Sequence, residues 1–364
     1  MALLSRTIPA DRTKFFETWN KTKGYAMSMN PNIPELRFFA GEAVNADWYA
    51  SNRGMILTSK RAPIFKPTSK VFTIGSCFAN EIRKALKLAD VEVYPKWNSL
   101  SIDFSSQIVA KLHSNENISH YDTFVLLQEF RDAFSHSELQ ENDFIQLQNT
   151  PAGKRLGVET VWQDPYRKQM YGSSFGAISD ISKKFTLCMR EGLDNADIYV
   201  ITLGLIEVWR NPANGRYFCR PPGTGFNGGQ GRDNAEFYLS TYEDNLKNVR
   251  EIVDLLHGTY PDKHIIFSVS PVGLERTFSD DDVIVANTYS KAILRAVVGQ
   301  VVQEYAKTEK VHYMPSFEVS QRIDIFDPDG RHVTENAARF IVDIFKLAFS
   351  DAPPASAGTM AGVA

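Results

Sequence analysis

Cysteine is scarce in this sequence, which has only three in 364 residues: Cys77, Cys188 and Cys219. None belongs to a C-x-x-C pair, and a small odd number in a chain of this length excludes a disulfide framework. Such cysteines are typical of a reducing compartment, so we expect a cytoplasmic protein. The seven histidines form no H-E-x-x-H pattern and no paired zinc spacing, so no metal site is expected.

A surplus of one charge and a long apolar run are also missing. The 40 Lys and Arg residues nearly balance 43 Asp and Glu, which leaves a formal net charge of -3. Nucleic-acid binders usually carry a marked basic excess, so nucleic acid is not an expected partner. No run reaches the roughly 18 apolar residues of a membrane helix. The N-terminal segment has no apolar core of a secretory signal. We therefore expect neither membrane association nor secretion.

Short apolar runs, each ended by a glycine, a proline or Ser-Pro, alternate with stretches of helical spacing. This alternation predicts an α/β protein with a parallel sheet, whose sites lie beyond the carboxyl ends of the strands. The expected strands are residues 71–74, 91–94, 198–203, 264–269 and 311–314, and the expected helices are 80–88, 243–256, 283–305 and 335–349.

The changes in pattern along the chain predict one α/β domain with additions. We expect an N-terminal arm packed on the core over residues 1–65, the domain over 66–350, and a disordered tail over 351–364. Two insertions are expected in the domain: a mostly helical one at 104–190 with a hairpin-like segment at 153–162, and a Gly-rich loop at 211–238. This loop lacks the G-K-[S/T] ending of a phosphate loop, so a nucleotide triphosphatase is excluded.

The turn Gly75-Ser76-Cys77 follows the first strand and opens the first helix. A helix N-terminus favours a thiolate and offers amide donors to an oxyanion, so either Ser76 or Cys77 is a candidate nucleophile. The structural alternative is that Ser76 only caps the helix and that Cys77 is a small apolar residue in the core.

A second candidate cluster lies before the last predicted helix, where Asp329 and His332 have a D-x-x-H spacing. The carboxylate would orient one imidazole nitrogen while the other acts as a general base. A plain turn with a surface histidine is the alternative. Nearby Arg331, like Arg210 and Arg220, is a candidate for binding an anionic group on a substrate.

The segment F-T-I-G-S-C-F-A-N-E-I contains the pentapeptide that names the GSCFA family, and the chain resembles that family, a group similar to the SGNH/GDSL hydrolases. The resemblance spans about residues 66–350 and continues in residues 202–209, 270–272, 286–291, 315–318 and 329–332. It implies a flavodoxin-like, three-layer α/β/α sandwich around a central parallel sheet. It also implies acyl-transfer chemistry on esters.

The resemblance also implies roles for particular residues. Aligning Gly75 with the glycine of the G-D-S block places Cys77 at the nucleophile, with His332 as base and Asp329 as its orienter. A register shifted by one residue gives the nucleophilic role to Ser76 instead.

The third block of SGNH enzymes reads G-x-N-D, and its asparagine donates to the oxyanion. Here Gly204-Leu205-Ile206-Glu207 has no asparagine, so we expect the donors to be the amides of Cys77 and Gly204, or the Asn98 side chain. Glu207 is expected either to orient a donor or substrate hydroxyl, or only to start a helix.

These residues together predict an enzyme that hydrolyses or transfers an O-acyl group, most plausibly acetyl on a carbohydrate, with a small molecule or a polysaccharide as its substrate. No cofactor is required, although acyl-CoA is a possible donor, and a cytoplasmic location favours transfer. Aromatic residues could stack on sugar rings or simply pack the core: Trp97, Trp162, Tyr166, Trp209 and Phe226. The alternative function is a non-catalytic carbohydrate-binding or scaffold protein on a degenerate hydrolase fold.

Overall fold

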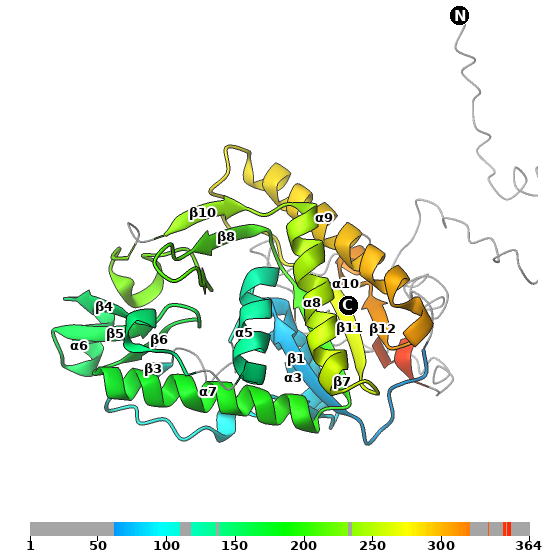
Figure 1. Cartoon of the computed structure of the whole chain (residues 1–364), viewed down its shortest axis with the longest axis horizontal. Coiled ribbons are helices and arrows are strands. Elements are labelled where there is room, and N and C mark those ends of the chain that lie inside the picture. The colour runs from blue at the N-terminus through cyan, green and yellow to red at the C-terminus, as the bar shows by residue number, and fades with distance from the viewer. Residues whose placement is uncertain are drawn as a thin grey trace, which may run out of the picture. The chain divides into compact units, whose positions relative to one another are not determined.

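A computed structural model describes residues 62–109, 118–135, 138–231 and 235–320, together with 334, 345–346 and 348–350. Five parallel strands form its central sheet, in the order β12-β11-β7-β1-β2 (Figure 1). The five predicted strands are therefore confirmed. Their bounds are β1 Lys70–Gly75, β2 Glu92–Tyr94, β7 Ile198–Leu203, β11 His264–Val269 and β12 Val311–Met314.

The burial of the central strands explains their sequences. Every residue of β7 is buried, because strands lie on both sides of it and helices cover both faces. After β1 the chain first adds β2 on one side and later returns to add β7 on the other side. The gap between the carboxyl ends of β1 and β7 is thus the topological switch point, where α/β sheets bind ligands.

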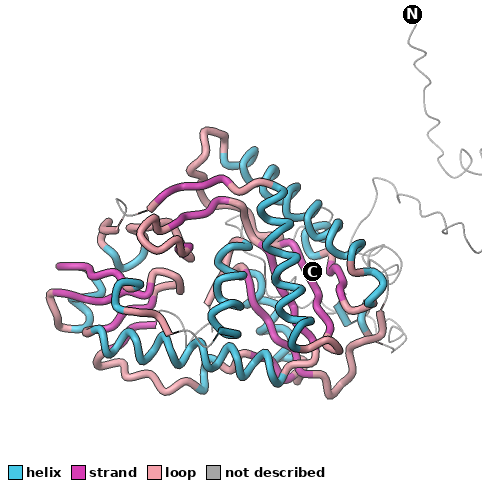
Figure 2. The backbone as a smooth tube through the Cα atoms, viewed as in Figure 1, coloured by secondary structure: helices cyan, strands magenta, loops and turns pink. Residues whose placement is uncertain are grey.

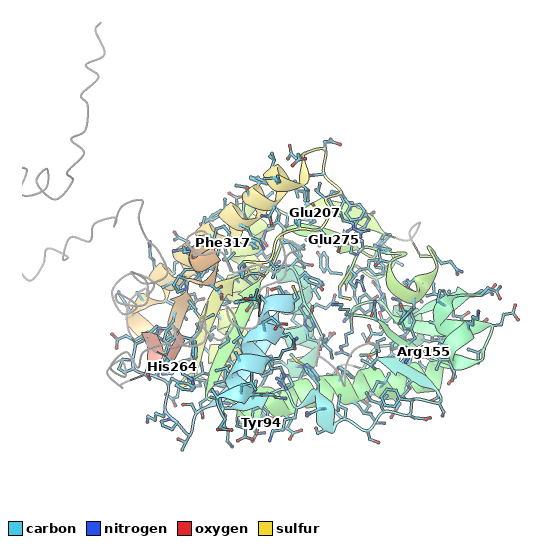
Figure 3. All side chains as sticks on the ribbon, turned by 180° about the vertical axis from the view of Figure 1, so that it is seen from behind. Tyr94, Arg155, Glu207, His264, Glu275 and Phe317 are labelled. Carbon is cyan, nitrogen blue, oxygen red and sulfur yellow. The ribbon has the colours of Figure 1, made fainter. Side chains whose placement is uncertain are left out.

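Helices cover both faces of this sheet. In Figure 1, α8 lies in front of the strands, whereas α3 lies in front when the molecule is seen from behind in Figure 3. The predicted three-layer α/β/α architecture is therefore confirmed. The long helices are α3 Cys77–Leu88, α5 Thr123–Ser135, α7 Phe175–Asn195, α8 Tyr242–Thr259 and α9 Val283–Glu304, and the short ones are η1 Trp97–Ser99, η2 Glu141–Asp143, η3 Gly225–Asn227, η5 Ala306–Thr308 and α10 Ser316–Ser320.

The first insertion differs from its prediction. Besides α5 and α7 it contains a four-stranded antiparallel sheet, visible in Figure 2 apart from the central strands. The hairpin expected at 153–162 is wrong, because its first residues belong to α6 (Pro151–Leu156). Thr150 caps this helix by accepting a hydrogen bond from the Gly153 amide, and Gly157 ends it at φ 70°. The strands are β3 Gln107–Val109, β4 Ile145–Gln148, β5 Thr160–Asp164 and β6 Met170–Gly172, in the order β3-β6-β5-β4.

The expected Gly-rich loop at 211–238 also contains strands. Two of them, β9 (Tyr217–Phe218) and β10 (Glu236–Leu239), pair on either side of β8 (Glu207–Arg210) in an antiparallel sheet. They are two and four residues long, too short to give a periodic signal. The new sheet directly follows β7, so it stands at the carboxyl end of the central sheet (Figure 1).

The expected N-terminal arm and C-terminal tail fall almost wholly outside the described residues. Of the arm, residues 62–65 are described, and Phe65 forms a parallel bridge with Ser350 and packs its ring against Phe345 at 5.5 Å. Only the end of the predicted helix 335–349 is described. In the described ranges, no helix combines the length and apolar character that crossing a membrane requires.

Candidate functional site at the switch point

Three segments meet at the carboxyl ends of β1 and β7. The Gly75-Ser76-Cys77 turn follows β1, Gly204 follows β7, and the loop residues before α5 cross between them. The His120 amide donates to the Gly75 carbonyl at 2.7 Å, and the Gly204 amide donates to the Tyr121 carbonyl at 3.0 Å. This crossing segment was not anticipated from the sequence, because its short polar stretch carries no periodic pattern.

Close backbone contacts explain why glycine stands at both strand ends. Gly75 has φ +134°, and a Cβ built on it would lie 2.1 Å from the Thr202 carbonyl oxygen. A Cβ on Gly204 would lie 2.6 Å from the Tyr121 carbonyl oxygen and 3.2 Å from Cβ of Ser76. Any side chain at either position would therefore push apart the segments that form the site.

Ser76 and Cys77 lie in different environments although they are adjacent. Ser76 is the N-cap of α3: its side chain is 3% exposed, and its oxygen accepts a hydrogen bond from the Phe78 amide at 3.2 Å. Cys77 is the first residue of the helix and is partly exposed. The capping role expected for Ser76 is therefore present, whereas the buried apolar position considered for Cys77 is not.

Lys291 enters the site from α9. It is 2% exposed, and its Nζ donates to the Gly204 carbonyl at 2.6 Å. Burial lowers its pKa to about 7, while the charge of Cys77 acts in the opposite direction. Residues 286–291 match the family pattern, but no role for Lys291 follows from the sequence, because its partner lies 87 residues away in the chain.

The oxyanion donors expected from the sequence are only partly in place. The Gly204 amide is committed to Tyr121, so the expectation that it donates to an oxyanion is not met in this structure. Asn98 lies in η1 after β2 and is exposed. The Cys77 amide stands in the first turn of α3, where helix amides point toward the end of the sheet.

Glu207 does not begin a helix, and its carboxylate is engaged in hydrogen bonds within the protein. It is the first residue of β8, and its carboxylate accepts hydrogen bonds from the Thr277 hydroxyl and, at 3.2 Å, from the Phe278 amide. It thereby fixes the loop after β11. Figure 3 shows Glu207 beside Glu275 of that loop, far from His264 at the opposite end of the sheet.

His120, in the segment that crosses between the two strand ends, belongs to a buried cluster of charged and polar side chains. His120 and Glu129 are 1% and 4% exposed, and Nε2 of His120 lies 3.2 Å from Glu129. Arg167 donates to the same carboxylate at 2.7 Å. Burial alone would raise the pKa of Glu129, but the charge of Arg167 and the contact with His120 hold it well below its usual range. Sequence reasoning missed this cluster, because its members are far apart along the chain.

The remaining candidate residues either lie away from the switch point or fall outside the described residues. Asp329, Arg331 and His332 lie outside the described residues, so their predicted roles stay predictions. Arg210 is exposed and lies 3.7 Å from Glu236, a partner on the neighbouring strand. Arg220 lines a cavity beside the insertion sheet.

Cys188 and Cys219 differ from Cys77. Both are buried, and burial raises the pKa of the Cys188 thiol to about 12 and that of Cys219 also far above its ordinary value. All three cysteines lie in the described ranges, and none is in a disulfide.

The aromatic residues fall into two groups. Trp97 is buried and stacks on Phe185 at 5.0 Å, as a core residue does. Trp209 instead forms a partly exposed aromatic cluster with Phe237, at 5.2 Å, and Phe278, at 4.9 Å. This cluster lies on β8, which follows β7, on β10, which pairs with β8, and on the loop after β11. Of the other candidates, Tyr166 is buried, and Trp162 and Phe226 pack against hydrophobic clusters.

Cavities and metal ligands do not single out another site. One surface cavity lies between α5 and α7 and another beside the Gly-rich loop, and neither is lined by Cys77 or Gly204. Among the side chains that the structure describes, no group of three His, Cys, Asp or Glu residues could hold a metal ion.

Comparisons with known proteins bear on the family alone. One crystal structure is 14% identical and has a TM-score of 0.24, a likeness too weak to support an argument. The match covers 41% of this chain and 62% of that one, less than two thirds of its length. No curated protein matches the chain. The model of the GSCFA family matches residues 70–345, most of the sequence, and the chain therefore belongs to the GSCFA family.

Proposed function

We propose that this protein is an acyl-transfer enzyme that forms a covalent thioester on Cys77. The observation that carries the proposal is the difference between the two candidate nucleophiles. The Ser76 oxygen is buried and occupied by the Phe78 amide, whereas the Cys77 side chain is partly exposed at the start of α3. The position at a topological switch point is the place where such a sheet binds its substrate.

In the proposed reaction, the Cys77 thiol gives its proton to a base, for which His332, oriented by Asp329, is the candidate. The sulfur then attacks the carbonyl carbon of an ester; a carbon–sulfur bond forms, the carbon–oxygen bond breaks, and the alcohol leaves with a proton from the base. Water or a second hydroxyl next attacks the thioester and restores the thiol. A reducing cytoplasm would keep this thiol available, and acyl-CoA would serve as donor for transfer.

A carbohydrate O-acyl group, most plausibly acetyl, is the proposed substrate. The cluster of Trp209, Phe237 and Phe278 supports it, because partly exposed aromatic faces are suited to stacking on sugar rings. Phe278→Ala is expected to weaken turnover of an acetylated oligosaccharide while leaving a small aryl acetate unchanged. Equal losses on both substrates would contradict a role in sugar binding.

The covalent step is tested by intact-protein and peptide mass spectrometry after mixing the chain with an aryl acetate or acetyl-CoA. We expect one acetyl group on Cys77, and none on that peptide in Cys77→Ala. Cys188→Ala is the matched control, because its buried thiol should not react. If wild type acquires no acyl group from either donor, and Cys77→Ala turns over esters as fast as wild type, the proposal is wrong.

A carbohydrate-binding protein without catalysis is the second candidate. It is favoured by one observation, the Gly204 amide that donates to Tyr121 instead of facing a substrate. Losing one oxyanion donor typically costs about 10²–10³ in rate. Binding of an acetylated oligosaccharide that Cys77→Ala does not alter, without turnover by wild type, would favour this candidate.

A further inference from the structure

One face of α9 fastens the loops that follow two central strands. Asn287 accepts a hydrogen bond from the Leu274 amide, after β11, at 3.1 Å. Lys291, one turn later on the same face, donates to the Gly204 carbonyl, after β7, at 2.6 Å. The 286–291 segment therefore has a place at the site that the proposed acyl-transfer chemistry has not used.

The buried Lys291 side chain reaches the segment that packs against the turn of the proposed nucleophile. Gly204, its hydrogen-bond acceptor, lies against Ser76, the residue before Cys77. Within the described chain, Cys77 is the titratable group whose charge acts on Lys291. The next cationic residue of α9, Arg295, is instead paired with Glu318 at 2.6 Å. A buried lysine ammonium that donates to a neutral carbonyl, as Lys291 does to that of Gly204, gains no opposite charge from that contact, and a nearby thiolate would supply one.

We propose that Lys291 is a positioning residue for Cys77, whose ammonium stabilises the Cys77 thiolate while its hydrogen bond holds the end of β7 in place. The inference rests on the proposed function only in taking Cys77 as the reacting group. The thiol proton leaves to the base or to water, and Lys291 keeps its own proton because the new negative charge favours the ammonium. Burial otherwise lowers the pKa of Lys291 to about 7, which makes the lysine sensitive to the state of its neighbour.

The test measures how fast iodoacetamide alkylates Cys77 as a function of pH, resolved by peptide mass spectrometry, with Cys188 and Cys219 as internal references. Lys291→Gln keeps a donor for the Gly204 carbonyl but removes the charge. We expect its alkylation midpoint to rise by about 1–3 pH units, the usual effect of an opposite charge nearby. Lys291→Arg keeps the charge, so its alkylation midpoint should stay close to that of wild type. Asn287→Ala, the matched control on the same face of α9, should leave the midpoint unchanged.

An unchanged midpoint in folded Lys291→Gln would overturn the inference, as would an equal shift in Asn287→Ala. If the Lys291 variants do not fold, the wild-type chain still provides a test. A cation beside the thiol should make anionic iodoacetate react faster at Cys77, relative to neutral iodoacetamide, than it does with glutathione. The excess should fall as the pH rises and Lys291 loses its proton. No excess at any pH would also overturn the inference.

These readouts separate the inference from the proposed function. A midpoint that depends on Lys291, in a chain that never becomes acylated, would support the electrostatic role and reject acyl transfer. Acylation of Cys77, with an alkylation midpoint that does not depend on Lys291, would support acyl transfer and reject the electrostatic role of Lys291.

Discussion

Two substitutions one residue apart, Ser76→Ala and Cys77→Ala, should separate folding from chemistry. In the structure Ser76 caps α3 through the Phe78 amide and is 3% exposed, whereas Cys77 is partly exposed at the first helical position. Removing the first side chain should therefore weaken the helix, and removing the second should eliminate the reactive atom.

The expected magnitudes follow from these positions. Replacing a serine N-cap by alanine costs about 0.5–2 kcal/mol, and in a domain of this size about 1 kcal/mol lowers Tm by about 2–4 °C. Cys77→Ala removes one partly exposed sulfur without a capping role, so we expect a loss below about 1 kcal/mol. Acylation and alkylation at position 77 should persist in Ser76→Ala and be absent in Cys77→Ala.

The assay pairs thermal unfolding with labelling on the same preparations. Ser76→Thr serves as a control, because threonine also caps helices and should recover most of the lost stability. The reasoning would be refuted by the opposite pattern, in which a stable Ser76→Ala loses acylation and Cys77→Ala keeps it. That result would assign the nucleophile to Ser76 and require the helix to be capped differently when substrate is bound.

Three further substitutions test the framework of the fold, two beside the site and one at the opposite end of the central sheet. Gly75→Ala should prevent folding, because its Cβ would lie 2.1 Å from the Thr202 carbonyl oxygen; a soluble variant with a Tm near wild type would contradict this. Glu129→Gln leaves the buried Arg167 with the Asp164 carboxylate, at 3.6 Å, in place of its closest charge partner, and should lower the unfolding free energy by about 3 kcal/mol in urea denaturation. Burial lowers the pKa of His264 to about 4, so the fold favours its neutral form and stability should fall as the pH drops from 6.5 toward 4. Since this histidine is half-buried, we expect a loss of only about 1–2 kcal/mol, which His264→Asn should remove.

The central sheet was predictable because the burial of its strands determines which residue types stand in them. A strand covered on both faces must be apolar at consecutive positions, as residues 198–203 are, and each run ends where the chain turns. The same logic located the turn at Gly75, because α/β sheets place their sites after strand ends. Strand order did not follow from these signals, since parallel neighbours need not be neighbours in sequence.

The insertions were predicted less well for an equally physical reason. The strands of the insertion sheet are three to five residues long, and β9 has only two, so their alternation is too brief to distinguish from a loop. The segment at 153–162 was expected to be hairpin-like, yet Pro151 and Gly157 stand at the first and the terminating positions of a short helix. The same two residue types mark helix ends and hairpin turns, and only the pairing partners decide between them.

The site itself shows where sequence reasoning had to stop. The order G-S-C fixes which residue caps the helix: the cap folds its oxygen back onto the Phe78 amide, and the next side chain is left at the first turn. Assigning the cap to Ser76 and the exposed position to Cys77 needs only local geometry, although the sequence alone left the choice between the two nucleophiles open. Lys291 is different, because its contact with Gly204 joins residues 87 positions apart and a lysine on a helix normally faces water. Only the three-dimensional arrangement reveals that this lysine is buried, and the same burial makes its charge matter to a thiol nearby.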